Sequence, residues 1–497
     1  MSILAIDAGT TGVTALLVDE AGAIIARGYQ EFEQHFLKPG WVEHEPEQIW
    51  QATLAAVRTA LSFSPLGEIE SREAVRAIGI TNQRETVVLW HRQTLQAARK
   101  AIVWQDRRTH EIVEELREAG HEPSIRAKTG LGLDPYFSST KLTWVRRNEP
   151  ELWGSVERGE VLIGTVESYL VARLTSGRLH ITDASNASRT QLMNIHDGGW
   201  DAELLNLFGV PADSLPSIVP NWGRFGLTDP GAFEGITAEI CGMAGDQQAA
   251  LFGQTAFASG DSKCTYGTGA FLLYNTGSRV VESQNGLLTT VAWTTPSGDT
   301  TYALEGSVFV AGATVQWLRD QLGFVASSAE IEALAGSVAD TNGAVFVPAL
   351  TGLGAPWWDS LVRGTLVGLT RGTSKAHLAR AALEAVAMQV CDLAEAMGKD
   401  VGSPLARLRV DGGMSANDLL MQLQADVLGV AVERSTNAES TGLGAAFMAG
   451  LGAGIFGSLA ELQELWQLNR RFDVHPFDRA KVDRWHRAVA HARAWAN

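Results

Sequence analysis

The sequence is poor in cysteine. Only three occur among 497 residues, namely Cys241, Cys264 and Cys391, and they are far apart and form no CxxC pair. An odd number of widely spaced thiols builds neither a disulfide framework nor a cysteine-based zinc site. This scarcity favours a reducing compartment, and we expect a cytoplasmic protein.

Positive charge is also scarce, with 40 lysines and arginines against 56 aspartates and glutamates and a formal net charge of −16. An acidic chain has no general attraction for nucleic acid or for an anionic membrane surface. We therefore expect neither nucleic-acid binding nor membrane insertion. Any phosphate that the protein binds must be held by local groups.

A strongly apolar run of about 20 residues, which a membrane span requires, is missing as well. The longest apolar stretch covers residues 442–462, but it is rich in glycine and alanine and is interrupted by Ser458. We interpret this stretch as a buried pair of helices. At the start of the chain, Asp7 follows Met1 too closely for a signal peptide, and no basic leader is present.

The remaining composition is typical of a folded protein, with 45% hydrophobic and 19% charged residues. At roughly 100–200 residues per domain, the length allows about two to four domains. Strand patterns alternate with helix patterns, which predicts an α/β protein. We place the domain boundary just after residue 249, so that the predicted domains are 1–249 and 250–497.

No Walker A pattern GxxxxGK[ST] occurs, but two short turns rich in glycine and threonine do. We expect the first, residues 7–12, to join two strands, and the second, residues 266–269, to repeat that arrangement. Backbone N–H groups in such turns bind anions, and threonine hydroxyls add donors. The turns together predict a site that clasps one polyphosphate between two domains. Because Asp7 would repel phosphate, we assign it to Mg²⁺.

A carboxylate near mid-chain, Asp246, follows a β-prone run and Gly245 and precedes a helical pattern. A carboxylate fixed at a strand-to-helix turn is well placed to accept one proton as a general base. Taken alone, Asp246 is better explained as a helix cap, because aspartate is a favoured N-cap residue. The two glycine-rich turns on either side of it in the chain favour the catalytic interpretation.

Polar residues also follow other predicted strands. Residues 411–417 enter a helix, where nucleotides commonly bind, although a tight turn with a helix cap explains them too. Arg84 donates and Glu85 accepts, so the pair can read hydroxyl groups, and a solvated loop is an equal alternative. Trp104 and Phe271 offer apolar faces either to a carbon skeleton or to the core.

Periodicity and cap signals predict several other elements. A long helix is expected over residues 373–397, with Gly398 beyond its end, and an edge-like strand over residues 430–434. Residues 209–220 contain three prolines and are expected to form a loop. Amphipathic helices are expected over residues 47–62 and 478–495.

Nine motifs in order, among them AIDAGTTGVT, GITNQRE, MAGDQQAALFG, CTYGTGAFLL and RVDGGMSAND, span nearly the whole chain. Together they resemble the FGGY carbohydrate kinases, and within that family the members that phosphorylate glycerol. The resemblance implies two ribonuclease-H-like domains of the type found in actin and hexokinase, with a catalytic cleft between them. It also implies ATP- and Mg²⁺-dependent phosphorylation of glycerol to sn-glycerol 3-phosphate. The matching motifs cover nearly the whole chain and are AIDAGTTGVT, GITNQRE, AIVWQDRRT, DPYFSSTKLTW, MAGDQQAALFG, CTYGTGAFLL, ALEGSVFVAGATVQWLRD, FVPALTGLGAPWWD and RVDGGMSAND.

The resemblance implies roles for individual positions. Asp246 would accept the hydroxyl proton and, with Asp7, would hold Mg²⁺. The other residues that would contact glycerol are Arg84, Glu85, Trp104, Tyr136, Gln247 and Phe271. The residues that would bind the nucleotide are Thr10, Thr11, Gly12, Thr268, Gly312, Gln316, Gly413, Met414 and Asn417. We also expect a homo-oligomer, either a dimer or a tetramer.

Two positions depart from the family pattern. Thr14 stands where these kinases usually carry an arginine that contacts nucleotide phosphate, so the charge clamp on the phosphates is weakened. Arg224 is the only cation in residues 221–241, which argues against a sugar-bisphosphate control site. Three alternatives remain open: a kinase for a longer polyol or ketose such as erythritol, xylitol or xylulose, an ATP-driven switch, and a polyol sensor without phosphoryl transfer.

Overall fold

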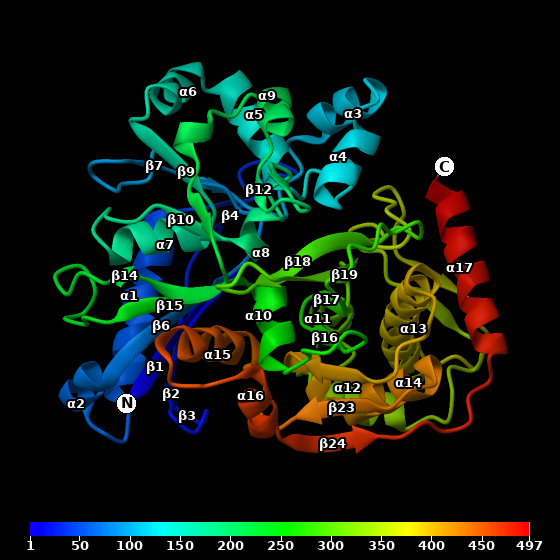
Figure 1. Cartoon of the computed structure of the whole chain (residues 1–497). Helices are drawn as coiled ribbons and strands as arrows, with labels where there is room; N and C mark the ends of the chain where they lie inside the picture. Colours follow the sequence, from blue (N-terminus) through cyan, green and yellow to red (C-terminus); the bar gives the residue numbers. More distant parts are fainter. Residues whose placement is uncertain (497) are drawn as a thin grey trace.

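Two lobes, each built around one mixed sheet, make up the computed structural model, which describes residues 1–496 (Figure 1). The sheet of the first lobe has the strand order β14-β15-β6-β1-β2-β3. The bounds of its strands are β1 Ser2–Ala8, β2 Gly12–Asp19, β3 Ile24–Glu31, β6 Val75–Asn82, β14 Trp222–Leu227 and β15 Glu239–Gly245.

The sheet of the second lobe has the order β18-β19-β17-β16-β22-β23-β24. Its strands are β16 Ser262–Tyr266, β17 Ala270–Gly277, β18 Leu288–Thr294, β19 Thr300–Val308, β22 Leu408–Asp411, β23 Val432–Ser435 and β24 Leu468–Phe472. Each sheet has its own buried core, formed mainly by aliphatic side chains of the strands and of the helices that cover them.

The two sheets share one topology. In the first lobe β1, β2 and β3 are antiparallel neighbours, and β6 and β15 then run parallel to β1. In the second lobe β16, β17 and β19 are antiparallel neighbours, and β22 and β23 then run parallel to β16. This repeat confirms the predicted fold class of two ribonuclease-H-like domains.

The two lobes meet through a pair of helices that follow equivalent strands. Helix α10 (Asp246–Gly253) follows β15, helix α15 (Ser440–Ala453) follows β23, and the two pack closely at the centre of the molecule (Figure 1). A Cβ atom on Gly444 would lie 1.8 Å from the carbonyl oxygen of Ala249, so this approach requires glycine. Helix α15 also covers β1, β6 and β15 of the first sheet, although it belongs in sequence to the second lobe.

Smaller elements decorate both lobes. The remaining helices are α1 Pro46–Ser62, α2 Glu68–Ala74, α3 His110–Glu118, α4 Glu122–Thr129, α5 Ser138–Asn148, α6 Pro150–Glu157, α7 Val166–Leu174, α8 Ala184–Ala187, α9 Ala202–Phe208, α11 Gly312–Asp320, α12 Glu330–Gly336, α13 Lys375–Val401, α14 Asp418–Leu428, α16 Leu459–Leu465 and α17 Ala480–Ala496. Short strand pairs or triplets involve β4 Gln34–His35, β5 Glu43–His44, β7 Val88–His91, β8 Ala101–Ile102, β9 Val161–Gly164, β10 Ile181–Asp183, β11 Met193–Asn194, β12 Gly199–Trp200, β13 Ser217–Val219, β20 Val345–Val347 and β21 Thr365–Val367.

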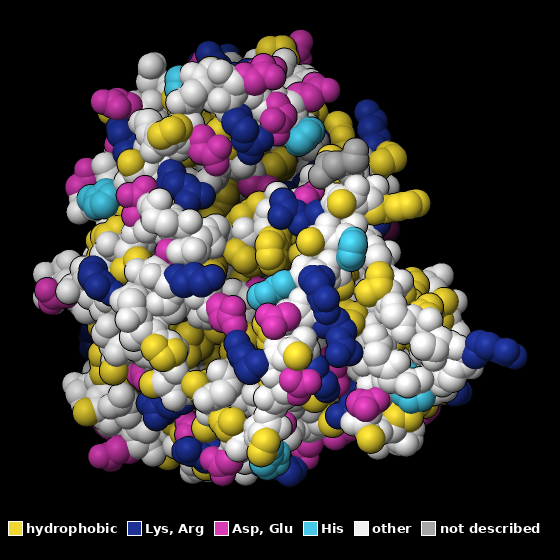
Figure 2. All heavy atoms as spheres, turned by 90° about the vertical axis from the view of Figure 1, so that its right-hand side faces the viewer, with side chains coloured by type: hydrophobic (Ala, Val, Ile, Leu, Met, Phe, Trp, Pro, Cys, Tyr) yellow, Lys and Arg dark blue, Asp and Glu magenta, His cyan; other side chains and the backbone are white. Residues whose placement is uncertain are grey.

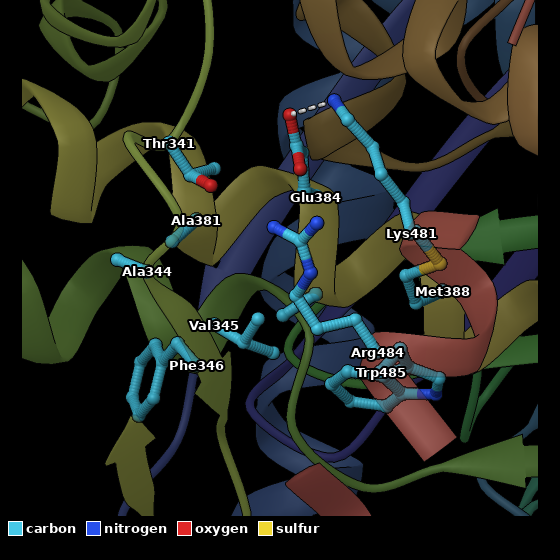
Figure 3. A pocket seen from close by; sticks show the side chains of 11 residues that line it. Thr341, Ala344, Val345, Phe346, Ala381, Glu384, Met388, Lys481, Arg484 and Trp485 are labelled. Atoms are coloured by element: carbon cyan, nitrogen blue, oxygen red, sulfur yellow. Dashed lines mark hydrogen bonds and ion pairs between the residues drawn. The ribbon is translucent and has the colours of Figure 1, made fainter. Parts of the chain in front are cut away.

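Helix α17 packs beside α13 (Figure 1) and also contacts β20. The buried indole of Trp485 donates a hydrogen bond to Asp392 of α13 at 2.8 Å. Beside it, Lys481 reaches Glu384 at 3.4 Å across a small pocket of about 30 Å³ (Figure 3). The face that carries this helix shows acidic, basic and apolar side chains interspersed (Figure 2).

Four local predictions were wrong. Asp7 lies inside β1, opposite Thr14 of β2, because the turn comprises only the residues between Ala8 and Gly12. Gly398 lies inside α13, and the left-handed residue after that helix is Gly402, with φ +83°. The strand near residues 430–434 is not an edge, because β24 pairs with it on its outer side. The proline-rich loop contains a 3-10 turn and strand β13.

The apolar stretch of residues 442–462 forms one buried helix, α15, and the start of a second, α16, of which Leu462 alone is buried. No helix within residues 1–496 combines the length and the apolar character needed to cross a membrane. The predicted domain boundary after residue 249 falls within α10, and it stays a prediction.

Candidate active site

The ends of three parallel strands bring the predicted acceptor residues together. Strands β1, β6 and β15 lie side by side, with Asp7 in register with Thr81 and Gly245 in register with Asn82. Residues that follow the ends of neighbouring parallel strands share one edge of the sheet, where ligands of α/β proteins bind. Asp246 lies 164 residues after Asn82 in the sequence, and Arg84 lies 2 residues after it. The pairing of β15 with β6 nevertheless places Asp246 and Arg84 next to each other.

Asp246 is the first residue of α10, and Gly245 is the N-cap. One of its carboxylate oxygens accepts a hydrogen bond from the backbone N–H of Gln247 at 2.7 Å and lies 3.1 Å from Nε of Arg84. The side chain is 29% exposed, so it is fixed on one side and open on the other. A carboxylate held in this way can accept a proton from a group in the open space.

The glycine before Asp246 makes room for Arg84. A Cβ atom at Gly245 would lie 2.6 Å from Cδ of Arg84, which no side chain tolerates without a shift. Arg84 is buried, and its guanidinium donates to both carboxylate oxygens of Glu305, at 2.5 and 2.9 Å, and to the amide oxygen of Gln248 at 3.2 Å. Its contact with the Tyr136 hydroxyl, at 3.4 Å, is longer.

Glu85 is buried in an unusual backbone conformation, with φ +63°. Positive φ is costly for a residue with a side chain, and such strain is found where a side chain must point in one direction. Its carboxylate accepts a hydrogen bond from Nε of Arg189 at 2.7 Å. Burial raises the pKa of Glu85, while Arg84 and Arg189 oppose that rise.

Three aromatic rings from both lobes form one wall. The ring of Trp104 lies 5.5 Å from that of Tyr136 and 6.4 Å from that of Phe271, both edge-on. The indole N–H of Trp104 donates to the hydroxyl of Thr10 at 2.9 Å. Trp104 therefore connects the first glycine–threonine turn with the strand that follows the second one.

Gln247 is oriented by a buried lysine. Its amide oxygen accepts a hydrogen bond from Nζ of Lys263 at 2.5 Å, and the same ammonium donates to Thr265 at 2.8 Å. Burial lowers the pKa of Lys263. The amide nitrogen of Gln247 is thereby turned away from Lys263, so that it can serve as a donor to a ligand.

Asp7 lies in a strongly electronegative position. Burial, the charge of Asp246 and the charge of Glu439 together raise the pKa of Asp7 to about 8, and only Arg27 acts in the opposite direction. A carboxylate that repels its neighbours and lacks a close donor is suited to bind a divalent cation through oxygen. Within residues 1–496, no group of three or more His, Cys, Asp or Glu side chains is arranged to hold a metal ion.

A pocket of about 430 Å³ opens in the second lobe beside the turn of residues 267–269. Helix α11 begins at its wall, and a Cβ atom on Gly312 would lie 2.5 Å from the carbonyl oxygen of Gly267. Six of the residues predicted to bind a nucleotide line it: Thr268, Gly312, Gln316, Gly413, Met414 and Asn417. The other three, Thr10, Thr11 and Gly12, lie outside its lining, at the turn between β1 and β2.

The two positions that depart from the family pattern have ordinary structural roles here. Thr14 is nearly buried in β2, between Asp7 and Tyr29 in the sheet register. Arg224 pairs with Glu239 at 3.0 Å and donates to the carbonyl oxygen of Ala453 at 3.3 Å.

Sequence reasoning missed four residues of this site, namely Arg189, Gln248, Lys263 and Glu305. Arg189 and Lys263 stand in segments with no local charge pattern, and Gln248, although it directly follows Gln247, was given no role. Glu305 offered one signal, because it is the only charged residue in the largely apolar segment of residues 302–310. An isolated charge in a largely apolar segment indicates a buried partner.

Comparisons with known proteins give a consistent result. The model of the N-terminal domain of the FGGY family of carbohydrate kinases matches residues 2–253, and that of the C-terminal domain matches residues 262–453. A glycerol kinase from Bdellovibrio bacteriovorus is 52% identical over 485 residues, covering 98% of this chain and 97% of its own. A glycerol kinase from Aromatoleum aromaticum is 52% identical over 496 residues, covering 99% of both.

Solved structures agree with these matches. A glycerol kinase from Plasmodium falciparum, crystallised with ADP, superposes with a TM-score of 0.90 at 36% identity and covers 99% of this chain and 98% of its own. A xylulose kinase from Rhodospirillum rubrum superposes with a TM-score of 0.83 at 24% identity, covering 100% and 98%. The latter likeness concerns the fold alone.

Proposed function

Because the chain belongs to the FGGY family of carbohydrate kinases, we propose that it transfers the γ-phosphoryl group of ATP to glycerol and so forms sn-glycerol 3-phosphate. Its relatives at about 50% identity over the full length are glycerol kinases. The observation that carries the proposal is the position of Asp246, whose partly exposed carboxylate lies beside Arg84 at the edge of the first sheet.

The acceptor pocket that we propose is small and has both donors and acceptors. Glycerol hydroxyls would bind to Arg84, Glu85, Tyr136, Gln247 and Asp246, and the carbon chain would pack on Trp104 and Phe271. Arg84 can give up its long contact with Tyr136 for a ligand hydroxyl without losing its two short bonds to Glu305. The rings of Tyr136 and Phe271 both lie edge-on to Trp104, so together they would offer one apolar wall to the carbon chain.

Asp246 acts as the general base in this proposal. It accepts the proton of one terminal hydroxyl as the oxygen of that hydroxyl attacks the γ-phosphorus in line with the leaving group. The backbone N–H of Gln247 and Nε of Arg84 hold one carboxylate oxygen, so the other is available to the substrate. Closure of the two lobes excludes water that would otherwise hydrolyse ATP.

We assign the nucleotide to the 430 Å³ pocket of the second lobe. Six predicted residues line the pocket, and the Thr10–Gly12 turn of the first lobe would donate to phosphate oxygens from the opposite side. The bond between Trp104 and Thr10 supports that placement, because Trp104 also contacts Phe271 of β17, the strand that leaves the 267–269 turn. The predicted domain 1–249 would thus bind the polyol and the phosphates and carry the base, and the predicted domain 250–497 would bind the nucleotide.

Mg²⁺ would be held by Asp7 together with Asp246. The fit rests on the raised pKa of Asp7, which a bound cation would reverse by favouring the ionised form. Bound Mg²⁺ neutralises charge on the phosphates during transfer. Asp7 would be the main carboxylate that orients the ion, and Asp246 would help to hold it in addition to accepting the proton.

We also propose a cytoplasmic enzyme, since ATP is its substrate and its three cysteines are free thiols. A homo-oligomer, dimer or tetramer, stays our prediction, and light scattering on the purified chain measures it directly.

An ADP-release assay across glycerol, erythritol, xylitol and ribulose tests the proposed function. We expect turnover on glycerol and a loss of at least ~10²-fold in kcat for Asp246→Asn, which keeps the shape of the side chain but removes its basicity. Robust turnover on a four- or five-carbon substrate without turnover on glycerol would replace glycerol as the acceptor. ADP release that is independent of any polyol would instead point to an ATP-driven switch.

A further inference from the structure

We propose that Glu305 and Arg189 are positioning residues of the acceptor pocket, which hold Arg84 and Glu85 in place for the substrate. The inference rests on the proposed function, and neither residue belongs to the set predicted from sequence. All four side chains are at most 2% exposed. They form one continuous array in which carboxylates and guanidinium groups alternate.

Glu305 holds Arg84 from the opposite lobe. Arg84 follows β6 of the first sheet, whereas Glu305 lies in β19 of the second. The two parallel bonds, at 2.5 and 2.9 Å, use both oxygens of the carboxylate and both terminal nitrogens of the guanidinium. Such a bidentate pair fixes the plane and the rotation of the guanidinium, which a single bond does not. Arg84 Nε is thereby directed toward Asp246.

Arg189 links this pair to Glu85. It follows helix α8 and donates through Nε to Glu85 at 2.7 Å and through a terminal nitrogen to Glu305 at 3.1 Å. Its guanidinium also lies over the rings of Phe137 and Tyr136, at 5.5 and 5.7 Å from their centroids. Arg189 therefore contacts two proposed hydroxyl-binding residues, Glu85 and Tyr136, at the same time.

The charge of Glu305 is needed for the array to exist in a buried place. Two guanidinium groups close together repel each other, and a carboxylate that bonds to both removes that repulsion. Burial alone would raise the pKa of Glu305, but Arg189 and Arg84 lower it to about 2. Glu305 is therefore ionised throughout the range in which the enzyme would work, and removing its charge leaves two buried cations short of a partner.

Because Glu305 and Arg84 come from different lobes, the acceptor pocket is complete only while the lobes stay in the contact that places Glu305 against Arg84. The pair thus couples the alignment of the acceptor with the closure that excludes water. A purely structural ion pair would stabilise the closed fold without affecting how well glycerol in particular is bound and aligned.

Glu305→Gln separates the two roles, because it keeps the size of the side chain and replaces one acceptor oxygen by a donor that faces Arg84 or Arg189. Steady-state kinetics should show kcat/KM for glycerol reduced by ~10²-fold, as expected when a substrate is held out of alignment. KM for ATP should change by less than about twofold, since the nucleotide pocket is lined by other residues.

Glu305→Asp provides the conservative comparison. It keeps the charge but has a shorter reach, so it should recover at least about tenfold in kcat/KM for glycerol relative to Glu305→Gln, the worth of a hydrogen bond to a charged group. Asp392→Asn is the matched control, because Asp392 is also a buried carboxylate of the second lobe with two bonded partners, Trp485 and His486. It should lower the melting temperature and leave KM for glycerol unchanged.

Several outcomes would overturn the inference: a folded Glu305→Gln protein with wild-type kinetics toward glycerol, equal changes in the parameters for glycerol and ATP, or equal effects of Glu305→Gln and Asp392→Asn. If Glu305→Gln does not fold, Arg189→Lys is measured in the same way, and wild-type kinetics toward glycerol in that variant would count against the role of Arg189 and of the array. A wild-type enzyme that lacks glycerol turnover would refute the proposed function instead, and the variants would then be measured with the polyol that is turned over.

Discussion

Replacing Asp7 with asparagine is expected to stabilise the ligand-free protein while impairing its activity. The pKa of Asp7 is raised from 3.8 to about 8, by burial first and then by the charges of Asp246 and Glu439. Below about pH 4 the carboxyl is protonated in both the folded and the unfolded chain, so it does not affect stability. Between that pH and about pH 8 the unfolded chain releases a proton that the folded chain retains, and stability therefore falls as the pH rises.

The size of the effect follows from the same values. A folded-state pKa of about 8 against 3.8 unfolded implies a loss of about 1.4 kcal/mol per pH unit, or about 3 kcal/mol between pH 5 and pH 7. The full difference, about 6 kcal/mol, is an upper limit because the side chain retains some exposure to solvent. At about 2–4 °C per kcal/mol for a cooperative unit of 150–250 residues, a loss of about 3 kcal/mol corresponds to about 6–12 °C in melting temperature, again as an upper limit.

The assay is differential scanning calorimetry at pH 5, 6 and 7, without Mg²⁺ or nucleotide, on wild type, Asp7→Asn and the control Asp213→Asn. Asp213 is an exposed residue of the 3-10 turn in residues 212–214. Other groups titrate in this range, but they are common to all three proteins and cancel in the differences. The advantage of Asp7→Asn should grow with pH, and added Mg²⁺ with ADP should stabilise wild type more than this variant.

Parallel melting curves for wild type and Asp7→Asn across the three pH values would refute the reasoning. They would mean that the Asp7 carboxylate is solvated or already paired in the folded protein. If the stability advantage of Asp7→Asn over wild type shrank as the pH rose, the reasoning would also fail, because the pKa of Asp7 would then be lowered on folding and not raised. If Asp7→Asn lost activity without gaining stability, Asp7 would still have a role in the reaction, but electrostatic repulsion at Asp7 in the folded protein would not explain that role.

Three other substitutions probe separate parts of the site by steady-state kinetics. Gly245→Ala places a Cβ atom 2.6 Å from Cδ of Arg84, and we expect kcat/KM for glycerol to fall by ~10²-fold in a protein with an unchanged circular dichroism spectrum. Gly312→Val fills space only 2.5 Å from the carbonyl oxygen of Gly267, and KM for ATP should rise at least ~10-fold while KM for glycerol changes little. Trp104→Ala removes an aromatic wall of the acceptor pocket, and KM for glycerol should rise by ~10-fold or more, the worth of about 1.4 kcal/mol of lost apolar contact. Unchanged constants in any of the three would contradict the position that we assign to that residue.

Sequence patterns predicted the parts of the site that depend on local backbone geometry. A β-prone run followed by glycine, aspartate and a helical pattern correctly placed Asp246 at the junction of β15 and α10. The strand, turn and strand of residues 262–277 were predicted for the same reason, since glycine and threonine between two β-prone runs have few other conformations available.

What the sequence could not predict depends on contacts between distant residues. Glu305 bonds to Arg84, which is 221 residues away, and to Arg189, which is 116 residues away, and no local pattern encodes such pairings. The extension of β1 through Asp7 has the same origin, because pairing with β6 on one side and β2 on the other holds the backbone extended beyond the predicted turn. Strand β23 was expected at an edge because its outer neighbour, β24, comes more than 30 residues later.

The position of α10 explains why one residue can serve both lobes. Its first residue, Asp246, continues the first sheet, whereas its body packs on α15 and on strands β16, β17 and β18 of the second lobe. Close backbone contacts at Gly253 and Gly444 fix α10 against α15, so the base cannot move independently of the junction. The bond between Arg84 and Glu305 also joins the two lobes, and a motion that separates them at the acceptor pocket would have to break it. Contact between the lobes would therefore control how Arg84 aligns the acceptor, whereas the position of the base Asp246 would stay the same.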